Sequence, residues 1–69
     1  MSTTPADRIR TLLLRADNML KNEGDQASRT RRARQALEEA RDVARDPSVD
    51  ERVRELVERR LAGLDALEG

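Results

Sequence analysis

Apolar residues recur along this chain at spacings of three and four, which is the period of an amphipathic helix. Three such runs follow one another, separated by short stretches that contain glycine, aspartate or proline. The spacing predicts helices over about residues 5–22, 26–45 and 49–67. Because the links are short, consecutive helices are expected to lie antiparallel, which predicts an all-α, up-down-up three-helix bundle as a single domain over residues 1–69. The alternative is an extended arrangement in which the helices pair with a second chain.

The first helix is bounded by recognisable residues. Thr4 is a capping residue type, Pro5 suits the first helical position, and the carboxylate of Asp7 favours a helix N-terminus. Gly24 is expected just past the end. Its apolar face consists of Ile9, Leu12, Leu13, Ala16, Met19 and Leu20. On a helical wheel Leu12 falls at the edge of this face.

The second helix begins at Asp25 or Ser28, since both are capping residue types. Its apolar face consists of Ala33, Ala36, Leu37, Ala40, Val43 and Ala44, and it extends backwards through Thr30 and Gln26. A face made mostly of alanine lets neighbouring helices approach closely, but it buries little area per residue.

The third helix has two competing starts. Ser48 and Glu51 have the spacing of a capping box, whereas Asp46 and Pro47 fit a cap followed by a first-turn proline. The apolar face consists of Val49, Val53, Leu56, Val57, Leu64 and Leu67. Gly63 lies inside this helix, where it costs roughly 1 kcal/mol relative to alanine.

Two leucines do not fit the centres of these faces. Leu14 points away from the apolar face of the first helix, and Leu61 falls at the edge of that of the third. Because the first and third helices are expected to run parallel, we predict an apolar patch of Leu14, with Leu61, that docks another protein or a second copy. The simpler interpretation is that Leu14 is a single exposed leucine, which needs no function.

The densest positive charge lies at the start of the second helix, in Arg29, Arg31, Arg32 and Arg34. These side chains are candidate contacts for an anion or a nucleic acid. On a helix the four point in different directions, and the chain has no aromatic residue to stack on a base. The 14 basic residues are balanced by 14 acidic ones, which argues against nucleic acid as the main partner.

Arg60 falls in the middle of the apolar face of the third helix. One interpretation is a buried arginine presented to an anionic ligand or partner. The other is a side chain whose stem lies on the core while its guanidinium reaches water or a carboxylate such as Asp17 or Glu23.

The composition argues against catalysis and against the binding of cofactors or metals. The chain has no histidine, cysteine, tyrosine or tryptophan, so its serines have no activating base, and we expect no enzymatic activity, no cofactor, no metal and no small-molecule substrate. No apolar stretch is long enough to span a membrane, and the start of the chain lacks the order of a secretory signal, so a cytoplasmic location is expected. Arginine is strongly favoured over lysine, which we attribute to a GC-rich bacterial genome.

The second predicted helix resembles that of a tetratricopeptide-type hairpin. Ala33, Leu37 and Ala40 repeat the small, large, small spacing of that family, and the stretch RDPSVD resembles its proline-bearing link, so that the likeness covers about residues 16–50. The aromatic, leucine, glycine and tyrosine pattern of the first helix is missing, and Gly24 comes about one turn early. The resemblance implies a protein-interaction scaffold.

A core without aromatic residues is thin for a domain of this size, and a partner would add buried surface. The sequence therefore favours a non-catalytic protein-protein interaction module or homodimer. The alternative is a weak nucleic-acid-associated protein that uses the Arg29–Arg34 region.

Overall fold

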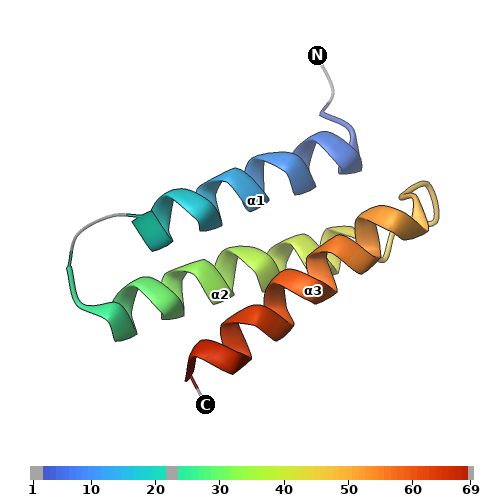
Figure 1. Cartoon of the computed structure of the whole chain (residues 1–69). Coiled ribbons are helices and arrows are strands. Elements are labelled where there is room, and N and C mark those ends of the chain that lie inside the picture. The colour runs from blue at the N-terminus through green and yellow to red at the C-terminus, as the bar shows by residue number, and fades with distance from the viewer. Residues whose placement is uncertain (1–2, 22–23, 69) are drawn as a thin grey trace.

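A computed structural model describes residues 3–21 and 24–68 of the chain. It contains three helices, α1 (Pro5–Lys21), α2 (Gln26–Val43) and α3 (Glu51–Glu68). Helix α2 runs back along α1, and α3 turns again to pack against α2 (Figure 1). The predicted all-α three-helix bundle is confirmed. Asn22, the last residue of the first predicted helix, lies outside the described residues.

The first two helices start where capping residues place them. The Thr4 hydroxyl accepts a hydrogen bond from the Asp7 amide at 3.1 Å, as the sequence predicts. Of the two predicted starts for α2, Asp25 is the correct one, because its carboxylate accepts from the Ser28 amide at 3.2 Å. The link before it includes Gly24 with a φ of +137°, a conformation that L side chains rarely adopt.

Both predicted starts of α3 are wrong. The Asp46 carboxylate accepts from the amide of Ser48 at 2.9 Å and from its hydroxyl at 2.8 Å, so these residues form a turn of their own. The helix begins at Glu51, and the carboxylate of Asp50 accepts from the Arg52 amide at 3.0 Å. The Ser48 amide, with its hydroxyl, holds the pKa of Asp46 below its ordinary value.

The core is aliphatic and draws on all three helices and the link before α3. Its buried members are Ile9, Leu12, Ala16, Ala33, Ala36, Leu37, Ala40, Ala44, Val49, Val57, Leu61 and Leu64. Buried Thr30 extends the α2 face as predicted, whereas Gln26 is exposed. Leu12, predicted at the edge, is buried, while Leu13 is only half-buried. The side chain of Leu67 lies outside the described part of the chain.

Helix α3 is rotated relative to its predicted orientation. Val57 is fully buried and flanked by Leu61 and Leu64, whereas Leu56 is 41% exposed. The reason is that α3 packs chiefly on α2 and has little contact with α1, so its buried direction is set by one neighbour. The wheel prediction placed Leu56 in the apolar face and Leu61 at its edge.

Two arginines join consecutive helices at their ends. From α2, Arg29 donates through Nη1 to the Leu20 carbonyl in the last turn of α1, at 3.2 Å. From α3, Arg54 donates through Nε to the Ala44 carbonyl at 2.6 Å and through Nη2 to the Asp46 carbonyl at 3.0 Å. The last carbonyls of a helix have no partner within it, and a positive charge there also favours the helix dipole.

The bundle is flattened. Its Cα atoms extend over 36 × 26 × 14 Å. Helix α1 lies along α2 over its length, whereas α3 lies obliquely across α2 (Figure 1). The α1–α3 side of the bundle is therefore its most open side.

We predict that Arg54→Gln lowers the free energy of unfolding by about 1–3 kcal/mol, because the partly buried Ala44 carbonyl loses a charged donor. The matched control is Arg52→Gln, which removes an exposed arginine from the same turn and should change stability by less than about 0.5 kcal/mol. Urea unfolding followed by circular dichroism measures both. Equal effects of the two substitutions would show that the Arg54 hydrogen bonds contribute nothing.

Asp46 also gives the stability a pH dependence. A carboxyl whose pKa is lowered in the folded state stabilises above its unfolded pKa, and this contribution is lost as the pH falls through the folded pKa. Asp46→Asn should therefore flatten the loss of stability below the ordinary aspartate pKa of 3.8. Urea unfolding at a series of pH values from about 6 down to about 3 measures this, and parallel pH profiles for the two proteins would contradict it.

Candidate functional site

The predicted patch of two leucines does not form. Leu14 is 58% exposed on the outer side of α1, as the wheel predicts. Leu61, in contrast, is 5% exposed and belongs to the core, so the prediction that it lies at an interface is wrong. The rotation of α3 toward α2 brings Leu61 inside and leaves Leu56 outside. Leu14 is then an exposed leucine without Leu61 beside it.

The basic region is divided between internal and exposed side chains. Arg29 is half-buried and donates to the Leu20 carbonyl, while Arg34 donates through Nη2 to Asp65 on α3 at 2.6 Å. Arg31 and Arg32 are exposed. The four arginines therefore do not form one continuous surface for a phosphate backbone, and two of them have structural contacts.

Arg60 connects α3 to α1. Its side chain is 46% exposed, and Nη1 donates to the Asp17 carboxylate at 2.6 Å. Asp17 is one of the two partners that the sequence suggests, and the other, Glu23, lies outside the described residues. Because this pair is open to solvent, its contribution to stability is about 0.2–1 kcal/mol.

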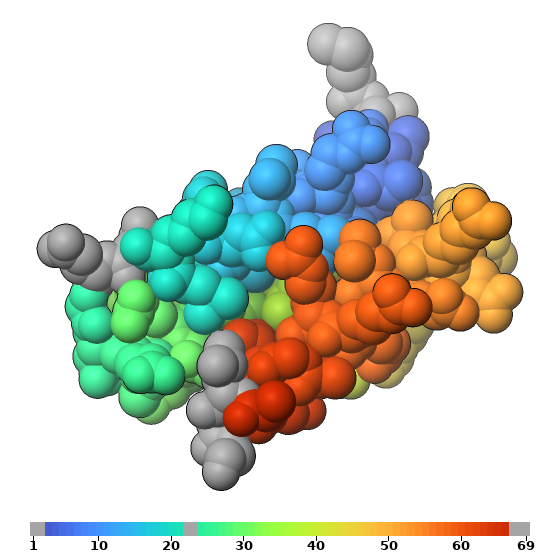
Figure 2. All heavy atoms as spheres, in the orientation of Figure 1, coloured from blue at the N-terminus to red at the C-terminus, as the bar shows by residue number. Residues whose placement is uncertain are grey.

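Beside this ion pair is a hollow between α1 and α3, which we call the α1–α3 hollow. It has a volume of about 250 Å³. It is lined by Ala16, Asp17, Leu20, Leu37, Arg59, Arg60, Gly63 and Leu64. In the space-filling view, atoms of α2 (green) are visible between α1 (blue) and α3 (orange and red) (Figure 2). The floor of the hollow comes from α2, and its walls come from the two outer helices.

The lining of the hollow combines aliphatic residues with three charged ones. The walls and floor are aliphatic, and the charged groups are those of Asp17, Arg59 and Arg60. Sites for small molecules typically have volumes of roughly 300–1,000 Å³. At about 250 Å³ the hollow is smaller than these, and its size and chemistry suit a single apolar side chain.

Each wall has a second apolar residue two turns before the hollow. On α1 the half-buried Leu13 lies two turns before Leu20 on the same face, and on α3 the exposed Leu56 lies two turns before Gly63. Gly63 leaves open space, since an added Cβ would meet no atom within 4 Å. Apolar residues therefore lie on both sides of the Asp17–Arg60 ion pair, which joins the two walls between them.

Sequence reasoning placed Leu20 and Leu37 only in the core, and Gly63 only as a helix-weakening residue. The one signal for the hollow is Gly63, an unfavourable residue inside a helix for which packing gives no reason. The hollow also depends on how α3 crosses α2, which the periodicity of one helix does not specify.

Within the described residues no group of three or more carboxylate, histidine or cysteine side chains is arranged to hold a metal ion. None of the helices described here has the length and apolar composition that crossing a bilayer requires. Comparison with known protein families, characterised proteins and solved structures finds no match. The resemblance to a tetratricopeptide hairpin therefore stays a prediction.

The two leucines should differ sharply when truncated. Leu61→Ala is expected to lower the free energy of unfolding by about 2–5 kcal/mol, because it leaves a cavity in the core. Leu14→Ala should change it by less than about 0.5 kcal/mol. Chemical unfolding of both variants tests the burial of Leu61, and a stable Leu61→Ala protein would contradict it.

Proposed function

We propose that this chain is a non-catalytic protein-interaction module that receives an apolar side chain of a partner helix in the α1–α3 hollow. The observation that carries the proposal is the one-sided packing of α3, which leaves an apolar hollow open between α1 and α3. A groove between two helices that presents aliphatic walls is a common acceptor for a third amphipathic helix.

The spacing of the apolar residues on the two walls supports a helical partner. Leu13 and Leu20 are separated by two turns of α1, and Leu56 and Gly63 by two turns of α3. A partner helix lying over the Asp17–Arg60 ion pair would present residues at i and i+7 to the apolar residues on either side of it, the spacing of anchor residues in this mode of recognition. It would cover Leu56, a large apolar side chain that the chain alone leaves 41% exposed.

The thin core supports the same proposal. The chain has no aromatic residues, and four of the twelve buried hydrophobic residues of the core are alanines from α2 and the turn after it, Ala33, Ala36, Ala40 and Ala44. Small domains bury a small fraction of their surface, so additional burial against a partner contributes proportionately more. The tetratricopeptide-like spacing of Ala33, Leu37 and Ala40 implies the same class of function.

Two substitutions at Gly63 distinguish the effect of filling the hollow from the effect of stabilising the helix. Gly63→Ala and Gly63→Leu both replace glycine in a position with open space around the Cβ, so both should fold and gain about 0.5–1 kcal/mol of stability. Only the leucine side chain is large enough to occupy the α1–α3 hollow. We therefore expect Gly63→Ala to retain the partner and Gly63→Leu to weaken binding at least tenfold, or about 1.4 kcal/mol.

The partner is sought by affinity purification from the encoding organism, with the wild type and both Gly63 variants as baits. Light scattering over a range of concentrations identifies a partner that is a second copy. A protein, or a self-association, that is retained by Gly63→Ala and lost by Gly63→Leu supports the proposal. A chain that stays monomeric and captures nothing that distinguishes the two variants contradicts it.

A further inference from the structure

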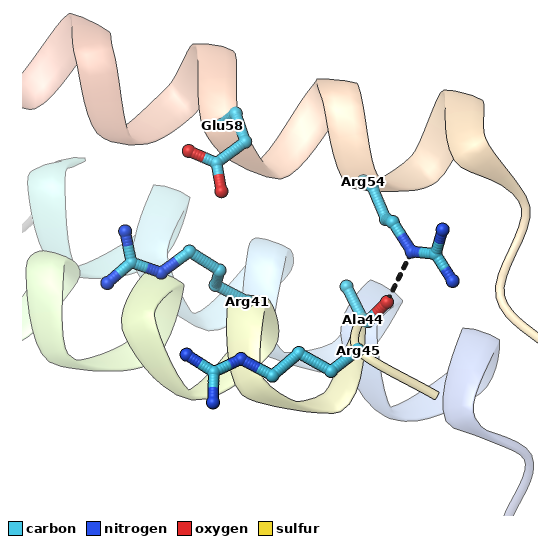
Figure 3. Close-up of a pocket in the computed structure, with 5 residues that line it drawn as sticks. All are labelled: Arg41, Ala44, Arg45, Arg54 and Glu58. Atoms are coloured by element: carbon cyan, nitrogen blue, oxygen red, sulfur yellow. Dashed lines mark hydrogen bonds between the residues drawn. The ribbon is translucent and has the colours of Figure 1, made fainter. Parts of the chain in front are cut away.

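A second hollow lies on the opposite edge of α3, where this helix meets α2. It has a volume of about 510 Å³ and is lined by Arg41, Ala44, Arg45, Arg54 and Glu58. Figure 3 shows the Arg41 and Arg45 side chains extended side by side along α2, with the Glu58 carboxylate facing them from α3. The Arg54 guanidinium points the other way, toward the Ala44 carbonyl (Figure 3). We call this the arginine hollow.

The register of α2 and α3 explains why positive charge accumulates here. Arg34 pairs with Asp65 across the two antiparallel helices at 2.6 Å. Two turns further along α2 and two turns back along α3, this register brings Arg41 level with Glu58. In the turn that follows the end of α2 at Val43, Arg45 lines the same hollow as Arg54. Arg34 and Arg41 each lie opposite an acidic residue of α3, whereas Arg45 shares the hollow with another arginine, Arg54.

The arginines of α2 are weakly neutralised at this point. Arg45 pairs with Asp42 at 3.7 Å, and both side chains are largely exposed. Arg41 has no ion pair with any residue that the structure describes. Arg41 is in the last turn of α2 and Arg45 is in the turn that follows it, and their like charges repel each other where both line the hollow. With three arginines and one glutamate, the formal charge of the lining is +2.

We propose that the arginine hollow binds a compact dianion, and specifically a phosphate monoester group. Guanidinium groups donate two parallel hydrogen bonds to phosphate oxygens, and two adjacent arginines offer this geometry from one side. A dianion would neutralise the lining charge and remove the repulsion between Arg41 and Arg45. Arg54, held by the carbonyls of Ala44 and Asp46, contributes a fixed positive charge.

The negative charge of Glu58 provides a test of anion binding in the arginine hollow. Its carboxylate faces the arginines and repels an anion, so Glu58→Gln should tighten binding of the dianion several-fold. If the arginines and Glu58 serve only to hold α2 against α3, this substitution would leave anion binding unchanged.

The experiment is a titration of the isotope-labelled full chain with inorganic phosphate, and separately with succinate, at constant ionic strength and followed by two-dimensional NMR. We expect saturable shifts at the end of α2 and the start of α3. Arg41→Gln with Arg45→Gln should weaken phosphate binding at least tenfold. The matched control is Arg31→Gln with Arg32→Gln, which removes the same charge from exposed positions of α2 away from the hollow. Circular dichroism confirms that all variants are folded.

Four outcomes would overturn the proposal. Shifts that do not saturate would mean that no site exists. Equal weakening by the two double substitutions would mean that the protein attracts anions through its overall field. If the Glu58→Gln protein bound phosphate no more tightly than the wild type, the anion would not be bound beside Glu58. Succinate that binds as tightly as phosphate would contradict the assignment to a phosphate group.

Discussion

The fold depends on hydrogen bonds that two arginines donate to the carbonyls at the end of the preceding helix. Arg29 follows the Asp25 cap of α2 by one turn, and Arg54 follows Asp50 by one turn in α3. In both places the aspartate satisfies amides at the start of one helix while the arginine satisfies carbonyls at the end of another. The same pair of residue types thus acts at both links, in addition to the backbone hydrogen bonds that end α2 at the Ala44 cap.

The alanines of α2 complement these end contacts. Ala33 and Ala40 are fully buried, and their small side chains allow α1 and α3 to pack closely on the same helix. Because alanine side chains are small, α2 contributes little buried apolar area to the core. Helix α2 is therefore an axis to which the other two helices are attached, and the direct contact between α1 and α3 is slight. Both candidate sites arise at the edges of α3 that this arrangement leaves open.

Much of the fold follows from local patterns, because capping residues and apolar periodicity act within one or two turns. Thr4, Asp25 and Gly24 are correctly read from the sequence for this reason. The start of α3 is not predicted correctly. Ser48 has the spacing of a capping residue, but its amide and hydroxyl donate to the Asp46 carboxylate instead. Leu56 and Leu61 exchange their expected places because burial on α3 depends on the direction of its packing, which no single-helix pattern contains. The two hollows are missed because each is formed by more than one helix.

The attachment of both outer helices to α2 also has a kinetic consequence. Each major contact joins helices that are neighbours in the sequence, so little of the structure requires distant parts of the chain to meet. Proteins dominated by such local contacts fold within microseconds to milliseconds, because little chain entropy is lost before contacts form. The contact between α1 and α2 is the more extensive of the two, so we expect this hairpin to form before α3 docks on it.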